Sequence, residues 1–139
     1  LIFSTKNRRP HITREIQPRL YDYIGGIVRA DDSILYDIGG VPDHIHLLVR
    51  MHQTHSIADF VRKLKSNTSG WIHRAFPNEK SFAWQEGYGA FSVSQSQIKK
   101  VGDYIRNQVE HHGRYDFKDE FRRLLMAHEI EYDEATIWL

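Results

Sequence analysis

The sequence of 139 residues contains no cysteine and no long apolar run. The absence of cysteine excludes disulfides and thiolate metal sites, so a bound metal would need histidine, carboxylate, amide or backbone ligands. Nine histidines are present to supply such ligands. The apolar runs are too short to cross a membrane and no secretory signal is visible, so we expect a cytoplasmic protein.

A strong net charge is also missing, since the formal charge of the chain is only +1. Residues 1–100 hold 14 Lys/Arg against 9 Asp/Glu, whereas residues 101–139 hold 5 against 9. A polyanion such as DNA can bind local basic patches of this kind, although charge alone favours a solvated surface. The basic excess gathers at Lys6, Arg8 and Arg9 and again at Arg62, Lys63 and Lys65.

Apolar periodicity and turn residues divide the chain into alternating strands and helices. Residues 1–4 read as the second half of a strand whose first half lies before Leu1. The pairs Ser56 with Asp59 and Ser94 with Gln97 resemble helix-capping boxes. The expected order is a strand at 1–4, a helix at 13–29, strands at 34–38 and 44–51, a helix from Ser56, a loop at 76–87, a strand at 88–93, and helices at 94–112 and 117–128.

This order is that of a split βαβ unit. It predicts an α+β protein of the ferredoxin-like class, in which an antiparallel sheet carries helices on one face and extra helices follow at the C-terminus. We expect one domain over residues 1–139. The second face of the sheet is then left open for a ligand, and the function must be argued from the residues on that face.

The segment His44-Ile45-His46 is the most informative part of the chain. Alternation along a strand places His44 and His46 on one face and turns Ile45 into the core. The two imidazoles would stand roughly 7 Å apart along the strand, which allows both to bind one cation. Two histidines at this spacing also occur by chance on exposed strands, so the pattern needs a third ligand to be specific.

Tyr104 and Gln108 are four residues apart on the expected helix at 94–112, so they lie one above the other on one side of it. An amide oxygen suits magnesium or manganese, and a phenol can attack phosphorus once the phosphate charge is neutralised. The alternative is that Tyr104 packs and Gln108 is solvated. His111 and His112 follow and could touch the site, but a helix C-terminus favours histidine through its dipole alone, which is the interpretation we prefer.

Together these residues resemble the single-tyrosine HUH transposases of the insertion-sequence 200/605 type. The HUH element is His44-Ile45-His46 within the segment 41–48. Further segments with the look of that family are Ser4 to Pro10, Trp84 to Ser92, and Tyr104 to Gln108 followed by His111 and His112. The resemblance spans essentially the whole chain, and the segments stand in the expected order.

The resemblance implies that His44, His46 and Gln108 bind a divalent cation, Mg²⁺ or Mn²⁺, and that Tyr104 is the nucleophile. The product would be a 5′-phosphotyrosine link with a free 3′-hydroxyl, so that strands can be cut and rejoined during DNA transposition. Many members are homodimers whose tyrosine helices complete each other's sites in trans, and a related group associated with repetitive extragenic palindromes works as monomers. Independently of the resemblance, Asp43 is expected to orient His44, with capping of the turn as the alternative.

The family recognises hairpins in single-stranded DNA, so we expect the hairpin ends of a mobile element as the partner. The two basic stretches are the expected phosphate contacts. A non-catalytic or domesticated single-stranded nucleic-acid-binding domain of the same fold remains the alternative, and metal-dependent cleavage separates the two. A zinc hydrolase would want three strong ligands and a carboxylate base.

Overall fold

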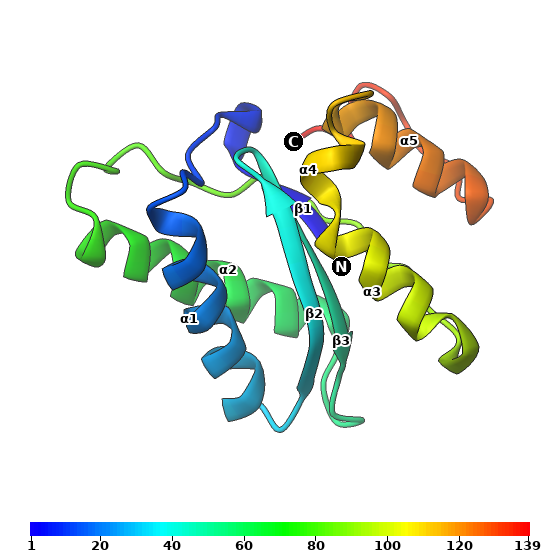
Figure 1. Ribbon diagram of the computed structural model, residues 1–139, viewed down its shortest axis with the longest axis horizontal. Helices are drawn as coiled ribbons and strands as arrows, with labels where there is room; N and C mark the ends of the chain where they lie inside the picture. The colour runs from blue at the N-terminus through cyan, green and yellow to red at the C-terminus, as the bar shows by residue number, and fades with distance from the viewer.

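Three antiparallel strands form the sheet in the computed structural model, which describes residues 1–139 (Figure 1). They are β1 (Ile2–Ser4), β2 (Ile34–Val41) and β3 (His44–Arg50), in the spatial order β1-β3-β2. The central strand β3 therefore pairs on both sides. Its residue Ile45 lies opposite Phe3 of β1 on one side and opposite Gly40 of β2 on the other.

Two long helices, α1 (Ile16–Ala30) and α2 (Ile57–Ala75), cover one face of this sheet. Their apolar residues recur at helical spacing and meet the inward-facing residues of the strands, so the main core forms between them. The members of this core that are shielded most completely are Phe3, Leu20, Ile24, Val28, Ile45, Leu47, Leu64 and Ile72. The helix predicted at 13–29 and the helix predicted from Ser56 are both confirmed.

The other face carries the C-terminal third of the chain, whereas the sequence led us to expect an open face. It holds α3 (Ile98–Arg106), α4 (Gln108–His111) and α5 (Phe117–Ala127), which lie on the opposite side of β2 and β3 from α1 and α2 in Figure 1. Two short 3-10 turns, η1 (Lys6–Arg8) and η2 (Gln95–Gln97), complete the list. The α+β class, the antiparallel sheet and the extra C-terminal helices are confirmed, and the sheet is enclosed rather than half-open.

The strand predicted at 88–93 is wrong. Only two isolated bridges, Ile2 with Gly89 and Thr5 with Trp84, connect this part of the chain to β1. A Cβ on Gly89 would overlap the ring of Phe121 and the side chain of Ile2, so the backbone passes through a narrow gap between β1 and α5. The segment therefore pairs with β1 only at Gly89 and Trp84 and forms no regular strand there.

The helix predicted at 94–112 is broken at Asn107, whose φ of −99° and ψ of 26° leave the helical region. The break rotates α4 relative to α3, so Val109 is 74% exposed instead of continuing the apolar stripe of Ile105. Ser94 makes no capping bond, and α3 starts through η2 instead. The helix predicted at 117–128 is confirmed as α5, which begins at the cap Asp116.

Gly39 and Gly40 continue β2, although we expected them to end it after Ile38. They pair with His46 and Ile45 of β3 and carry the strand to Val41. A Cβ on Gly39 would overlap the backbone of Ile105 in α3, so the glycine is needed for a close crossing and not for a turn.

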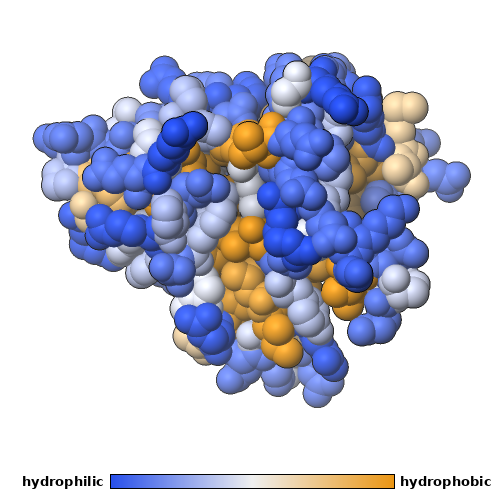
Figure 2. All heavy atoms as spheres, in the orientation of Figure 1, coloured by the Kyte–Doolittle hydropathy of each residue, from blue (hydrophilic) through white to orange (hydrophobic).

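The exposed surface of the sheet is small and apolar. Figure 2 shows orange side chains gathered over β2, between the two groups of helices, and Ile34 and Tyr36 of this edge strand are among the exposed large side chains. None of the helices has both the length and the apolar composition that a membrane span requires.

Replacing Ser56 by alanine should destabilise the protein, since the Ser56 side chain accepts a hydrogen bond from the Asp59 amide at the start of α2. We expect a loss of about 1 kcal/mol in the free energy of unfolding in a urea titration. Ser94→Ala is the matched control and should change it by less than about 0.5 kcal/mol, because the Ser94 side chain caps nothing. Equal losses in the two variants would contradict the assigned caps.

Candidate metal and nucleophile site

The pleat of β3 presents both histidines of the HUH element to the face under α3, α4 and α5. Ile45 and Leu47 point into the main core, so His44 and His46 point the other way. His44 is fully buried, His46 is 5% exposed, and their ring centroids are 5.3 Å apart. The sequence-based placement of the two imidazoles side by side is confirmed.

A carboxylate from α5 lies between these two rings. Glu120 Oε1 is 2.8 Å from His46 Nε2 and 3.2 Å from His44 Nε2. Its other oxygen, Oε2, accepts a hydrogen bond from the Tyr104 hydroxyl and lies 3.2 Å from His112 Nε2. Glu120 is 1% exposed, so one buried carboxylate joins three histidines and the phenol.

His112 and Gln108 stand side by side at the edge of this group. His112 Nε2 is 2.9 Å from Gln108 Oε1, and its Nδ1 is 2.8 Å from the carbonyl oxygen of Tyr115. The Gln108 amide nitrogen donates to the Tyr104 carbonyl oxygen at 3.3 Å. Gln108 is buried, and its side-chain oxygen faces His112. Its role as a metal ligand stays a prediction.

Tyr104 lies on α3 with its ring edge-on to His46 at a centroid distance of 5.9 Å. The ring also packs against His111 at 4.6 Å. The side chain is half-buried, and its hydroxyl group reaches Glu120. The structure therefore brings Tyr104, His46 and His44 together around a single acidic group within one chain.

Burial and hydrogen bonding shift the pKa values of this group in opposite directions. Burial raises the pKa of Glu120, but the imidazole nitrogens of His112, His44 and His46 that face the carboxylate outweigh this effect and hold the pKa well below its usual range. Burial and the neighbouring Glu120 carboxylate raise the pKa of Tyr104 above its ordinary value. The proton therefore stays on the phenol in the free protein.

The pKa values of the two HUH histidines also diverge. Burial lowers the pKa of His46. Burial also lowers that of His44, but the Asp43 and Glu120 carboxylates outweigh it and the net pKa is raised. Asp43 Oδ1 is 2.6 Å from His44 Nδ1. This contact is the geometry expected of a residue that orients a metal-binding imidazole, and it leaves Nε2 to face the cluster.

The donor set fits a divalent cation. One ligand atom each from His44, His46, His112 and Glu120 lies within 4.8 Å of the others. His44 Nε2 is a buried nitrogen without a hydrogen-bond partner, and it points at this group. Imidazole nitrogens suit transition metals, and a carboxylate suits magnesium or manganese. This group of residues is a possible metal site.

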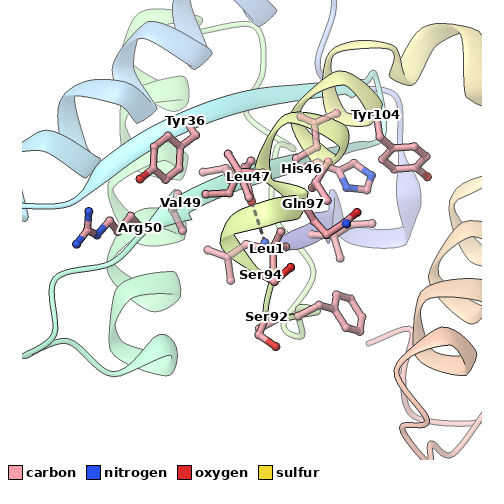
Figure 3. Close-up of a pocket in the computed structure, with 18 of the residues that line it drawn as sticks. Leu1, Tyr36, His46, Leu47, Val49, Arg50, Ser92, Ser94, Gln97 and Tyr104 are labelled. Atoms are coloured by element: carbon pink, nitrogen blue, oxygen red, sulfur yellow. Dashed lines mark hydrogen bonds between the residues drawn. The ribbon is translucent and has the colours of Figure 1, made fainter.

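A cleft of about 950 Å³ opens beside the possible metal site (Figure 3). It begins at His46 and Tyr104 and extends along β3 toward Arg50 and Tyr36. Its walls are mostly apolar and come from β3, α3 and the segment that leads into η2. Apart from the histidines, its basic groups are Arg50 and Lys100.

The predicted DNA contacts of the first basic stretch lie at the end of β1. Lys6 and Arg9 are exposed there, and Arg8 is half-buried because its guanidinium donates to the Trp138 carbonyl oxygen at 3.1 Å. The chain makes a tight bend at this point, since Asn7 and Arg8 both have φ near +55°. DNA binding by these side chains stays a prediction.

The second basic stretch lies on α2, and its three residues differ in how strongly other groups of the protein already bind their charged ends. Arg62 and Lys63 are exposed and pair with Asp59 and Asp31. Lys65 donates to the carbonyl oxygens of residues 85, 86 and 87, with the closest at 2.6 Å, and burial lowers its pKa to about 8. Lys65 thus fastens this loop to α2, and a DNA phosphate would have to compete with those carbonyl groups.

Sequence reasoning missed Glu120 and favoured a role for His112 outside the site. The helix dipole was the preferred reason for His112 at a helix C-terminus, and contact with the site was the alternative. The structure places His112 against Glu120. A signal for Glu120 does exist, because it falls on the apolar stripe of α5 between Phe117 and Phe121. A carboxylate on a buried stripe needs buried partners, and here three imidazoles supply them.

The comparisons with known proteins agree with this geometry. Residues 1–108 match the family described as "Transposase IS200 like". The chain is also similar to the ISDra2 transposase TnpA of Deinococcus radiodurans, with 26% identity over 113 residues that cover 78% of this chain and 81% of the relative.

Two solved structures resemble the fold. One is a crystal structure assigned to a transposase from Deinococcus radiodurans R1, with a TM-score of 0.64 and 28% identity over 77% of this chain and 86% of the other. The second is a REP-associated tyrosine transposase bound to a REP hairpin, with a TM-score of 0.60 and 19% identity over 81% of this chain and 66% of the other.

We expect Mn²⁺ to raise the melting temperature of the purified protein without DNA, because a ligand that binds only the folded state stabilises it. The gain is about 2.7 kcal/mol when the free metal is at 100 times its dissociation constant. His46→Ala should lose most of the shift in differential scanning fluorimetry. His128→Ala, whose ring bonds only within α5, should keep it. A full shift in His46→Ala would exclude this site.

Proposed function

This chain belongs to the IS200-like transposase family, and we propose on that basis that it cleaves and rejoins single-stranded DNA through a covalent link between Tyr104 and a 5′ phosphate. The observation that carries the proposal is the meeting of the Tyr104 hydroxyl with His44 and His46 at one buried carboxylate. The reaction would serve DNA transposition.

In this proposal the cation is held by His44, His46 and Glu120, with the amide oxygen of Gln108 nearby. Gln108 also keeps His112 in place, since its oxygen lies 2.9 Å from His112 Nε2. When bound, a divalent cation neutralises phosphate charge and orients the phosphorus for in-line attack. Mg²⁺ and Mn²⁺ are the proposed cations, and the two imidazole ligands favour Mn²⁺ in binding strength.

Tyr104 supplies the nucleophile. Its oxygen forms a bond to phosphorus while the bond from phosphorus to the 3′-oxygen breaks, and the leaving oxygen takes up a proton to become a 3′-hydroxyl. Glu120 accepts the hydrogen bond of the phenol and so orients its oxygen. The low pKa of Glu120 makes this carboxylate a weak base, so the phenol proton passes to water as attack proceeds. The phosphotyrosine link conserves the energy of the phosphodiester, so a 3′-hydroxyl can reverse the step and join strands.

The cleft beside Tyr104 is the proposed path of the strand to be cut. Its apolar walls suit unpaired bases, which stack on apolar and aromatic side chains. Lys6 and Arg9 are exposed at the end of β1 and would hold phosphates, as would Arg62 and Lys63 on α2. We extend to this chain the hairpin-bearing DNA that is bound in the structure of its REP-associated relative.

Tyr104→Phe should abolish cleavage of a labelled single-stranded oligonucleotide that carries a hairpin. Loss of the only nucleophile should lower the rate at least about 1,000-fold, whereas the dissociation constant for DNA should change less than about threefold, because one hydroxyl contributes little to phosphate binding. Mass spectrometry of the covalent adduct, with the modified residue mapped, provides the direct measurement.

Tyr88→Phe is the matched control, since Tyr88 lies on the far side of β1 from this site next to Lys65. It should cleave at the wild-type rate. An adduct mapped to another tyrosine would refute the assignment of the nucleophile. DNA binding without any metal-dependent cleavage by the wild-type protein would instead support the non-catalytic alternative.

A further inference from the structure

Two exposed cations, Arg50 and Lys100, line the cleft that extends from Tyr104. We propose that they bind backbone phosphates of the single strand that leads to Tyr104, so that the cleft holds this strand at fixed distances from the phosphate to be cut. The proposal rests on the proposed function. It adds which side chains hold the strand in the cleft and the order in which they contact its phosphates.

A row of side chains along β3 leads from the possible metal site to Arg50. His46, Leu48 and Arg50 are alternate residues of this strand, so all three point to the second face of the sheet. Arg50 therefore stands roughly 13 Å from His46 along the strand. Figure 3 shows His46 beside Tyr104 at one end of the cleft and Arg50 beside Tyr36 at the other. The strand thus carries a metal ligand, an apolar side chain and a cation in line.

A second row lies on the opposite wall, along α3. Tyr104, Lys100 and Gln97 are spaced by four and three residues, so they lie on one side of the helix, and all three line the cleft. The rise of a helix places Lys100 about 6 Å from Tyr104 along its axis. Lys100 is therefore the cation nearer to the site, and Arg50 is the farther one.

The positive charge of the cleft is not offset by carboxylates. No aspartate or glutamate lines the cleft, although the chain contains 18 acidic residues. The exposed arginines Arg62 and Arg106 each pair with an aspartate elsewhere on the surface. Arg50 and Lys100 form no ion pair. A cleft with charge of one sign and low-dielectric walls concentrates ligands of the opposite sign, so this cleft favours an anionic strand.

The space between the two ends of the cleft suits bases rather than further phosphates. Leu48 is 7% exposed beside Arg50 on β3, and Phe91 and Ile98 are half-buried in the walls. Tyr36 is 37% exposed at the Arg50 end and offers a ring on which a base can stack. Charged contacts alternate here with apolar ones, which matches a nucleic-acid strand and not a small anion.

The two distances predict which phosphates the cations contact. A stacked strand advances about 3.4 Å per nucleotide, and a strand with its bases splayed apart advances further. Lys100 therefore reaches a phosphate within about two nucleotides of the one held at His46 and Tyr104, and Arg50 reaches one within about four. Arg50 must contact the more distant of the two phosphates.

Removal of each charge tests these contacts. Arg50→Gln and Lys100→Gln are made in the Tyr104→Phe protein with Mn²⁺ present, so that a labelled oligonucleotide with a hairpin and a single-stranded flank is bound but not cut. Each change should weaken binding about fivefold and reduce the slope of log Kd against log salt concentration by about 0.7, the loss of one phosphate contact on a single strand.

Lys99→Gln is the matched control, because Lys99 is exposed on the same helix but lies outside the cleft. It should change the dissociation constant by less than about twofold, since salt screens a charge that does not touch the strand. Melting curves accompany all variants and should be unchanged, because the replaced side chains are exposed.

A scan of neutral phosphates determines the order of the contacts. Methylphosphonate replaces one phosphate at a time on each side of the cut phosphate, which is mapped from the covalent adduct of the wild-type protein. At the phosphate that Arg50 contacts, the replacement should weaken binding about fivefold with Arg50 present and less than about 1.5-fold in Arg50→Gln, because the partner charge is gone. Lys100 should show the same coupling at a phosphate nearer to the cut.

Salt slopes equal to that of Lys99→Gln, or losses that simply add at every phosphate, would overturn the proposal. A coupling of Lys100 farther from the cut than that of Arg50 would overturn it as well. A wild-type protein that forms no adduct would refute the proposed function and this proposal with it. Adduct formation without any coupling at Arg50 or Lys100 would refute the cleft contacts alone, so the two failures are distinguishable.

Discussion

The pleat of β3 is the constraint from which the rest of this structure follows. Successive side chains of the strand point to opposite faces, so the burial of Ile45 and Leu47 in the main core forces His44 and His46 to the second face. The central position of β3 makes this orientation rigid, because the strand is hydrogen-bonded on both sides. The chemistry of the site is thus attached directly to the packing that stabilises the fold, and a shift of one residue in register would destroy both.

The C-terminal helices enclose a charged group on the second face of the sheet. A carboxylate that is 1% exposed survives between His44, His46 and His112 because each imidazole offers it a nitrogen, and their interactions outweigh the cost of removing its charge from water. The same carboxylate holds the Tyr104 hydroxyl. The free protein therefore keeps the proposed nucleophile, the proposed ligands and the carboxylate in one shielded group. A site of this kind is preorganised, and under the proposed function DNA would enter through the cleft along β3 rather than across an open sheet.

Local patterns in the sequence predicted the strand with His44 and His46, the long helices and the α+β class, because each of these depends on residues close together in the chain. The missing strand at 88–93 and the break at Asn107 could not be predicted in this way. The segment at 88–93 meets Phe121 of α5 at Gly89, and the helix that breaks at Asn107 crosses Gly39 of β2 at Ile105. Both contacts join residues far apart in the chain, which local patterns do not show. The role of Glu120 could not be predicted for the same reason, since its partners lie up to 76 residues earlier and only the fold brings them near.

The attachment of the first strand to the last helix has a consequence for how the protein is made. Ile2 packs against Phe117, Phe121 and Leu125, so β1 gains part of its burial only when α5 is available. Contacts of such long sequence separation form late, because the intervening chain must first lose its freedom. During synthesis on the ribosome His44 and His46 emerge well before Glu120. A nascent chain consequently lacks the carboxylate and the enclosure, and the proposed cleavage activity would be deferred until translation has passed α5.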